Sequence, residues 1–312
     1  MPLHIQTPLL PSSALGRRTG ASVWLKVESV QPSGSFKMRG IGFACEEHHK
    51  RGARRFVSSS GGNAGLAVAY AARMLSVPTT VVVPQSTAQR ARELLRQEGA
   101  EVVVHGASWQ EANTLALSMV GPGDAFLHPF DDPLLWQGHA TMIDEVAQAG
   151  IRPDAVVLSV GGGGLLCGVV EGLRRNGWGN VPVIAVETDG AASLHQSVVA
   201  GRRVELDAIT SVATTLGAKQ VSAKAFDITR EHPLRSLVVS DAQAVSACVR
   251  LLDDHRLLVE PACGAALATL YDSAPELAQY RQILVIVCGG AGVTSAQLLA
   301  WSKQFSEPSV LA

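Results

Sequence analysis

The 312-residue sequence has few aromatic side chains and no long apolar run. Only 5% of the residues are Phe, Trp or Tyr, whereas 47% are hydrophobic, so the predicted core is aliphatic and rich in alanine. Such a core suits buried parallel strands covered by helices. The apolar runs, such as Ile283–Val287, have the length of strands and are far too short to span a membrane. We therefore expect no membrane partner.

The sequence also lacks a charge excess of one sign, a C-x-x-C pair of cysteines and a recognisable targeting segment. The net charge is −1, and the densest basic stretch, Lys50–Arg55, indicates a solvated helix end, so we expect no nucleic-acid partner. The N-terminal residues lack a basic region followed by an apolar one, so no signal peptide is predicted. The five cysteines form no C-x-x-C pair, which favours a reduced, cytoplasmic protein.

Apolar, β-rich runs alternate with helix-period segments along the chain. This alternation is typical of an α/β fold with parallel sheets and crossover helices. Strands are predicted over Val23–Val27, Arg55–Ser59, Thr79–Val83, Glu101–Val104, Ala155–Ser159, Val183–Glu187, Leu237–Val239 and Ile283–Val287. Helices are predicted near Phe36–Lys50, Ala64–Leu75, Ala88–Glu98, Trp109–Met119, Leu134–Ala149, Leu165–Arg175, Ala242–Asp254, Cys263–Tyr271 and Val293–Lys303.

We expect two domains, each with a mostly parallel twisted sheet flanked by helices. The small domain is predicted to comprise residues 35–129. The large domain is predicted to comprise residues 1–34 and 130–312, with the N-terminal strand returning to it. No linker rich in Pro, Gly or Ser marks either boundary.

One lysine lies at the start of a predicted helix, in the segment Pro32-Ser33-Gly34-Ser35-Phe36-Lys37-Met38-Arg39-Gly40. Ser33 or Ser35 is expected to cap the helix, and Gly34 permits a sharp turn. Lys37 would then lie among free backbone N–H groups at the positive end of the helix dipole, which lowers its pKa. The lowered pKa would make it a reactive amine; the alternative is a solvated surface lysine.

Three glycine-rich turns each follow a predicted strand and open a helix. In parallel α/β sheets, ligands bind beyond the carboxyl ends of the strands, where such turns gather. Four consecutive glycines at a helix start expose several N–H donors and favour a phosphate site, although tight turns also need glycine. The turns are Ser58-Ser59-Ser60-Gly61-Gly62-Asn63-Ala64-Gly65, Gly161-Gly162-Gly163-Gly164-Leu165 and Cys288-Gly289-Gly290-Ala291-Gly292.

Two nucleotide-binding motifs do not match these turns. The dinucleotide spacing G-x-G-x-x-G fails, because counting from Gly162 places Cys167 at the last position. No G-K-[ST] follows a glycine run, which excludes a Walker A loop. Glu187 nevertheless ends the next strand, where an acid would hold a ribose, so a dinucleotide-dependent enzyme stays an alternative.

Ser35-Phe36-Lys37, the Ser60-Gly61-Gly62-Asn63 turn, the tetraglycine turn and Cys288-Gly289-Gly290 together resemble fold-type II pyridoxal-phosphate enzymes. Within these, the chain is most similar to the L-serine/L-threonine dehydratases, from about Pro8 to Gly292. The similarity includes Pro129–Pro133, Leu158–Val169 and Leu258–Ala266. It implies a fold like that of the tryptophan synthase β subunit, pyridoxal 5'-phosphate as cofactor, a small amino-acid substrate and a homodimer.

The resemblance also implies residue roles. Lys37 would carry the cofactor as a Schiff base and act as the base at the substrate Cα, with Ser60 and Cys288 as further catalytic residues. The cofactor would be bound by Phe36, Lys37, Asn63, Gly161, Gly162, Gly163, Gly164, Leu165 and Cys288. The substrate carboxylate would be held by Ser60, Gly61 and Asn63. A potassium-like cation would be bound by Glu187 and the carbonyls of Gly161, Ala191, Leu216 and Ala218.

The implied reaction is β-elimination, which converts L-serine to pyruvate and ammonia and L-threonine to 2-oxobutanoate and ammonia. A neutral thiol at Cys288 would be a weak partner for the cofactor ring nitrogen and would favour elimination. A serine racemase and a β-replacing synthase stay alternatives with the same cofactor, and a non-catalytic ligand sensor stays one without turnover. Gly61 and Thr215 stand where some relatives carry Ala, so the preference between serine and threonine stays open.

Overall fold

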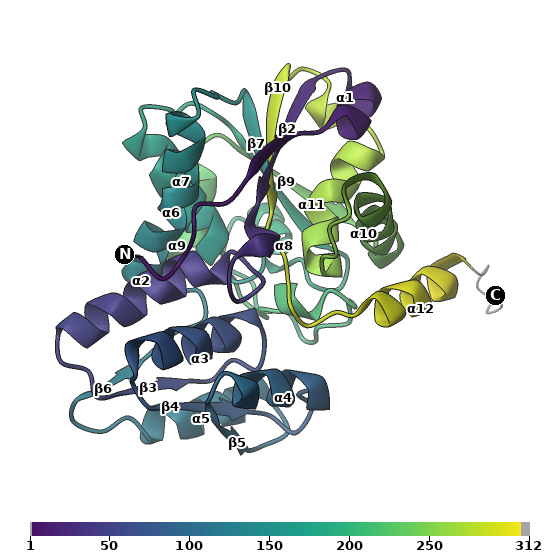
Figure 1. Cartoon of the computed structure of the whole chain (residues 1–312). Coiled ribbons are helices and arrows are strands. Elements are labelled where there is room, and N and C mark those ends of the chain that lie inside the picture. Colours follow the sequence, from purple (N-terminus) through teal and green to yellow (C-terminus); the bar gives the residue numbers. More distant parts are fainter. Residues whose placement is uncertain (1, 307–312) are drawn as a thin grey trace.

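The computed structural model describes residues 2–306, and its centre is a six-stranded β-sheet with the strand order β1-β2-β10-β7-β8-β9 (Figure 1). All neighbouring strands run parallel except β1, which pairs antiparallel with β2 at one edge. Strand β2, near the N-terminus, pairs with β10 of the C-terminal half. The strands are β1 (Leu9–Pro11), β2 (Ser22–Val27), β7 (Ala155–Ser159), β8 (Val183–Thr188), β9 (Leu234–Val239) and β10 (Gln282–Val287).

A second, fully parallel sheet has the order β5-β4-β3-β6. Its strands are β3 (Arg55–Ser58), β4 (Thr79–Val83), β5 (Glu101–Val104) and β6 (Asp124–Phe126). All four lie within the predicted small domain, and the six-stranded sheet lies outside it. The exact domain boundaries stay a prediction, and residues 1 and 307–312 of the predicted large domain lie outside the described residues.

In each sheet the order in which the chain adds strands reverses once. In the large sheet, β8 and β9 are added on one side of β7, and β10 is then added on its other side. In the small sheet, β4 and β5 are added on one side of β3, and β6 is then added on its other side. In parallel sheets, ligands bind at such a reversal point, in the crevice between the loops that follow the two adjacent strands and run to opposite faces of the sheet. The loops after β7, β10, β3 and β6 are therefore the expected lining of a site.

Helices cover the large sheet on both faces (Figure 1). One face carries α6 (Pro133–Gln148), α7 (Gly164–Arg175) and α9 (Ala223–Glu231), and the other carries α1 (Ser13–Thr19), α10 (Asp241–His255) and α11 (Pro261–Tyr271). Helix α8 (Ser193–Ala200) follows β8, and α12 (Ser295–Ser306) contacts α10. Short 3-10 turns are η1 (Glu28–Val30), η2 (Thr214–Leu216) and η3 (Pro275–Leu277).

The small sheet is covered by α3 (Asn63–Leu75), α4 (Gln89–Gln97) and α5 (Trp109–Ser118). Phe56 and Val57 are neighbours on β3 and bury their side chains in different clusters, Phe56 with α3 and Val57 with α5, because alternate strand residues face opposite sides of a sheet. Helix α2 (Lys37–Lys50) contacts both α3 and α6 and so lies between the two sheets (Figure 1).

Most predicted elements are confirmed, and the core is aliphatic and rich in alanine, as expected. Strands β1 and β6 were not predicted, since three residues carry almost no periodic signal. The short helices α1, α8 and α9 were also missed. The predicted serine cap of α2 is wrong: its N-cap is Phe36, and the hydroxyls of Ser33 and Ser35 have no partner within residues 2–306.

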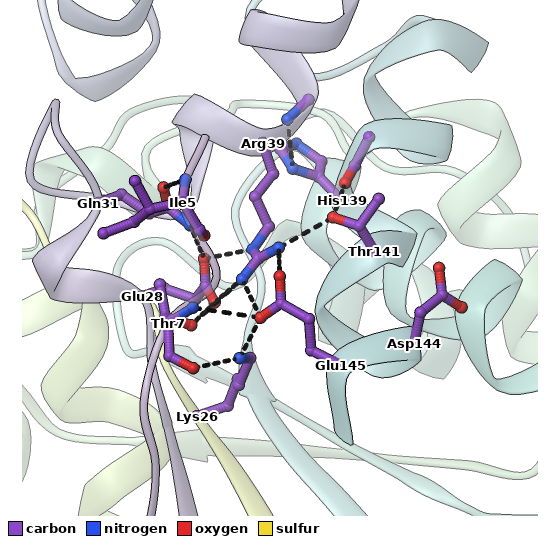
Figure 2. Close-up of polar contacts among 12 residues, drawn as sticks. Ile5, Thr7, Lys26, Glu28, Gln31, Arg39, His139, Thr141, Asp144 and Glu145 are labelled. Carbon is purple, nitrogen blue, oxygen red and sulfur yellow. Dashed lines mark hydrogen bonds and ion pairs between the residues drawn. The ribbon is translucent and has the colours of Figure 1, made fainter. Parts of the chain in front are cut away.

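A buried ion cluster attaches α2 to the large sheet and to α6 (Figure 2). The Arg39 guanidinium is fully buried and donates to both carboxylate oxygens of Glu28, at 2.7 and 2.9 Å, and of Glu145, at 2.6 and 2.8 Å. Lys26 on β2 also pairs with Glu145. Two cations thus meet two carboxylates, and the paired charges offset the cost of their burial.

The N-terminal segment closes over this cluster (Figure 2). Thr7 donates its hydroxyl to Glu28 at 2.7 Å and its N–H to Glu145 at 3.2 Å, and its carbonyl accepts from Lys26 at 2.8 Å. Gln31 forms two hydrogen bonds with the backbone of Ile5, both 3.0 Å long. The cluster therefore joins the N-terminal segment, β2, α2 and α6.

Glu145→Gln will lower the free energy of unfolding by about 3 kcal/mol at neutral pH, since it breaks a largely buried ion pair. Burial disfavours the charged form of Glu145, but hydrogen bonds and charges from Arg39 and Lys26 outweigh it and lower the pKa below the usual 4.5. The contribution of a carboxylate with a lowered pKa is present above its unfolded pKa and is lost as the pH falls below it. The difference between wild type and variant should therefore shrink below about pH 4.5.

Urea unfolding followed by circular dichroism at a series of pH values measures this difference. Asp144→Asn is the matched control, because Asp144 precedes Glu145 on α6 but pairs with the exposed Arg175. We expect it to cost at most about 1 kcal/mol. A Glu145→Gln effect that does not change between pH 7 and about pH 3 would contradict the prediction.

Candidate active site

Backbone hydrogen bonds place Lys37 beside the end of β10. The N–H of Phe36 donates to the carbonyl of Cys288 at 3.0 Å, and the N–H of Gly290 donates to the carbonyl of Gly34 at 2.9 Å. Gly289, between them, has φ +90°, and an added Cβ there would lie 2.5 Å from the Gly34 carbonyl oxygen. Glycine is required at this close approach.

Lys37 is the first residue of α2 and is partly exposed. Its Nζ donates to the carbonyl of Pro129 at 2.6 Å, in the loop after β6, and lies 5.0 Å from the centroid of the Phe36 ring. Burial of the amine lowers the pKa of Lys37 to about 8, against a smaller opposing effect of Cys288. The direction of this pKa change agrees with the prediction, and the cause that the structure shows is desolvation of the amine.

Phe36 lies between the lysine and α6. Its ring packs against the buried imidazole of His139, with ring centroids 4.9 Å apart. The Nδ1 atom of His139 accepts a hydrogen bond from the N–H of Gly40 at 3.2 Å. The half-buried ring thus belongs to the packing of α2 on α6 and stays beside the amine.

The tetraglycine turn links β7 to α7 and is packed against the loop after β6. An added Cβ at Gly162 would lie 2.3 Å from the Phe130 ring, and one at Gly164 would lie 2.7 Å from the Phe130 carbonyl oxygen. Gly163 is the N-cap of α7 and has φ +97°. Among the described residues, no acceptor binds the N–H groups of Gly161, Gly162 or Gly163. This set of free donors at a helix start, with Leu165 next to it, fits a phosphate.

The turn after β3 brings Asn63 toward the loop after β10. Asn63 is the first residue of α3, and Gly62 is the N-cap of this helix. The side-chain amide of Asn63 donates to Glu260 and accepts from the N–H of Ala291, both at 3.0 Å. Ser60 is half-buried, and its hydroxyl accepts from the N–H of Gly62 at 3.4 Å.

Gly61 lies in the same turn with little free space around it. An added Cβ would lie 2.8 Å from Cγ2 of Thr87 and 3.2 Å from Cγ1 of Val83. A larger residue at position 61 therefore requires its neighbours to move.

The Cys288 thiol is buried and uncharged. A hydrogen bond with Cys263, followed by burial, raises the pKa of Cys288 well above its usual value. Cys248 is also close, and its thiol donates to the carbonyl of Glu260 at 3.2 Å. A neutral thiol can at most form a weak hydrogen bond with a ring nitrogen.

Glu187 lies at the end of β8 and is fully buried. Its two oxygens accept from the N–H groups of Leu194 and His195, at 2.9 and 2.7 Å, at the start of α8. Because Glu187 is fully buried beneath this helix start, a ribose cannot reach it, and the dinucleotide interpretation, in which Glu187 holds a ribose, is wrong. Burial raises the pKa of Glu187 to about 8.

The other predicted cation ligands lie around the same strand end. An added Cβ at Gly161 would lie 3.2 Å from the carbonyl oxygen of Leu216, so these two backbones are in close contact. The N–H of Ala191 donates to the carbonyl of Thr188, the residue after Glu187, at 3.0 Å. The N–H of Ala218 donates to the carbonyl of Leu216 at 2.7 Å. No group of three His, Cys, Asp or Glu side chains with the geometry of a metal site occurs among residues 2–306.

The loops after β3, β6, β7 and β10, here called the switch-point loops, are thus joined to one another. The segment Phe36–Lys37 contacts those after β6 and β10, Gly162 meets Phe130, and Asn63 meets Ala291. Glu260, which joins two of them, was missed as a functional residue. In the sequence it stands directly before Pro261 at a helix start, where an acidic residue normally indicates a cap. Only its contact with Asn63, 197 residues away, shows that its side chain faces the site.

The sequence matches the family described as "Pyridoxal-phosphate dependent enzyme" over residues 1–289. It is 50% identical over 314 residues to human "L-serine dehydratase/L-threonine deaminase", an alignment that covers 97% of this chain and 96% of the relative. Human "Serine dehydratase-like" is also 50% identical, over 310 residues that cover 96% of this chain and 94% of the relative.

No described helix is both long and apolar enough to cross a bilayer.

The fold is likewise similar to that of solved enzymes. The crystal structure of a fungal L-serine ammonia-lyase from Rhizomucor miehei superposes with a TM-score of 0.91 at 38% sequence identity, covering 98% of this chain and all of the other. The α/β architecture predicted from the sequence is confirmed. With the family match over residues 1–289 and a relative that is 50% identical over 97% of its length, this chain belongs to the family of pyridoxal-phosphate-dependent enzymes.

Proposed function

We propose that this protein deaminates L-serine to pyruvate and ammonia, and L-threonine to 2-oxobutanoate and ammonia, by β-elimination. The observation that carries the proposal is the position of Lys37, whose amine has a pKa of about 8 at the meeting point of the four switch-point loops. Relatives named for these reactions share about half of its residues over nearly the whole chain.

The residues around Lys37 fit the cofactor. The free N–H groups of Gly161–Gly164, with Leu165, would bind its phosphate, and Phe36 would pack beside its ring. Asn63 would donate to its phenolic oxygen, and Cys288 would face its ring nitrogen. When bound, pyridoxal phosphate withdraws electrons from the substrate Cα and so makes the Cα proton acidic.

The chain itself binds the substrate and moves the proton. The turn Ser60-Gly61-Gly62-Asn63 would hold the substrate carboxylate with backbone N–H groups and the Ser60 hydroxyl, which fixes the Cα–H bond toward Lys37. The Lys37 amine, neutral above about pH 8, would accept the Cα proton. Loss of that proton and of the Cβ hydroxyl removes one water from serine. Hydrolysis then returns the water and releases pyruvate and ammonia.

Lys37→Ala will lower pyruvate formation from L-serine by more than about 100-fold, the usual loss on removing a general base. In the wild type, borohydride reduction of the holoprotein followed by peptide mass spectrometry should find the cofactor on Lys37. Because the folded pKa of Lys37 is about 8, uptake of the cofactor by the apoprotein should become faster as the pH rises through that value.

Lys50→Ala is the matched control, since Lys50 ends the same helix with a side chain that is 69% exposed. It should keep the wild-type rate and the adduct on Lys37. An adduct on another lysine, or none in the holoprotein, would contradict the role of Lys37. A product of D-serine without keto acid would point to a racemase instead.

Cys288→Ala will change the absorbance spectrum of the bound cofactor and reduce kcat by about fivefold, the size expected for one neutral hydrogen bond. Spectra and serine kinetics of the purified holoenzyme measure both effects. Cys45→Ala is the control, because Cys45 is an equally buried thiol in the middle of α2. If Cys288→Ala and Cys45→Ala both behave as wild type, the thiol has no role toward the ring nitrogen.

We further propose that Glu187 binds a potassium-like cation with the carbonyls of Gly161, Ala191, Leu216 and Ala218. Glu187 is buried without a Lys or Arg partner in the described part of the chain, and burial raises its pKa to about 8. A cation beside it would stabilise the charged carboxylate.

The homodimer and the cytoplasmic location stay predictions. The five cysteines are free and buried, which suits a reducing compartment.

The cation should make the thermal midpoint of unfolding of the holoenzyme higher in potassium chloride than in tetramethylammonium chloride at equal ionic strength. Differential scanning fluorimetry measures this, and Glu187→Gln should remove the difference. The same midpoint in both salts for the wild type would exclude a stabilising cation at this position.

A further inference from the structure

Glu260 is a buried carboxylate surrounded only by hydrogen-bond donors. Its Oε1 accepts from the N–H of Gly292 at 2.8 Å, and its Oε2 accepts from Asn63 Nδ2 at 3.0 Å and from the Thr215 hydroxyl at 2.9 Å. The side chain is 5% exposed, and no lysine or arginine pairs with it among residues 2–306. A glutamine could not replace it, because an amide offers one acceptor oxygen instead of two.

The backbone around Glu260 is arranged for this contact. Glu260 is the N-cap of α11, yet its side chain makes no capping bond, and Pro261 fixes the first helical residue. The loop after β10 leaves room for the carboxylate, because an added Cβ at Gly290 would lie 2.1 Å from Glu260 Cδ. The carboxylate is therefore directed at the site rather than at its own helix. Burial raises its pKa, while Gly292, Thr215 and Asn63 act in the opposite sense.

Glu260 and the N–H of Ala291 together define the orientation of the Asn63 amide. The N–H of Ala291 requires the amide oxygen on its side, and the carboxylate of Glu260 requires the amide nitrogen on its side. A flipped amide would place oxygen against carboxylate and N–H against N–H, which is unfavourable at both contacts. Only one of the two Nδ2 hydrogens is used, and no other acceptor for it occurs in residues 2–306.

We propose that Glu260 is a positioning residue that fixes the Asn63 amide so that its second Nδ2 hydrogen is presented to the cofactor's phenolic oxygen. The inference rests on the proposed function, which assigns that oxygen to Asn63. Asn63 belongs to α3 of the small sheet, whereas Glu260 and Ala291 belong to the large one. The contact also fixes the position of the turn Ser60-Gly61-Gly62-Asn63 relative to the cofactor cradle.

Glu260→Gln tests the proposal in the holoenzyme. With only one acceptor oxygen, the variant loses the charge-assisted bond to Asn63 or to Gly292, and we expect the dissociation constant of pyridoxal phosphate to rise about tenfold. Selective ¹⁵N labelling of asparagine gives a second readout, because the chain has only four asparagines: Asn63, Asn113, Asn176 and Asn180. The hydrogen bond to the carboxylate separates the two Nδ2 proton resonances of Asn63, so these resonances should move closer together when that bond is weakened. The absorbance spectrum of the bound cofactor should also change.

Glu101→Gln is the matched control, because Glu101 accepts from the Thr80 hydroxyl at 2.9 Å on edge strand β5, away from the switch-point loops. It should leave all three readouts unchanged. If Glu260→Gln does not fold, Glu260→Asp keeps the charge but withdraws the carboxylate by one methylene, and the same changes are expected. Wild-type resonances and a dissociation constant within about twofold of wild type, in whichever variant folds, would overturn the proposal.

Asn63→Ala separates failure of this inference from failure of the proposed function. If Asn63→Ala alters the cofactor spectrum and affinity but the Glu260 variants do not, Asn63 is correctly assigned and Glu260 does not position it. If Asn63→Ala also leaves the spectrum and the affinity unchanged, the assignment of the phenolic oxygen to Asn63 is wrong, and the inference falls with it.

Discussion

The site depends on the backbone contact between the turn before α2 and the end of β10. Two hydrogen bonds, from Phe36 to Cys288 and from Gly290 to Gly34, hold the start of α2 against the carboxyl end of a central strand. Lys37 follows directly, so its amine is directed to the place where the loops diverge. These contacts fix the main chain at Lys37 independently of side-chain rotamers, and the hydrogen bond from Nζ to the Pro129 carbonyl then orients the amine.

The ion cluster around Arg39 provides the second constraint, two residues further along the same helix. Arg39 donates to Glu28 and Glu145, and Lys26 also pairs with Glu145, so α2 is attached to β2 and α6 (Figure 2). Such buried pairs add little net stability compared with an apolar core, but losing one partner is costly. Their role here is to hold α2, which contacts both α3 and α6, in one orientation between the two sheets.

Residue patterns predict much of the fold and of the candidate site. The long strands follow from apolar runs of β-branched residues, and the three glycine turns mark the ends of β3, β7 and β10. The structure places all three turns at switch points, which the chain order of strands alone did not reveal. Local rules failed at the helix starts: Ser35 and Asn63 both suit a cap, yet neither caps its helix, because tertiary contacts hold these segments in place.

Residue patterns alone established the α/β class and the three glycine turns, marked Lys37 as the candidate reactive amine and, through resemblance, indicated the cofactor family. These features are encoded by periodicity and by short contiguous motifs. The three-dimensional arrangement was needed to show that burial lowers the pKa of Lys37, that Glu187 is buried beneath the start of α8, and that Glu260 faces Asn63. The reason is that desolvation and hydrogen bonding act between groups far apart along the chain, and no local pattern states which distant donors will surround a given carboxylate.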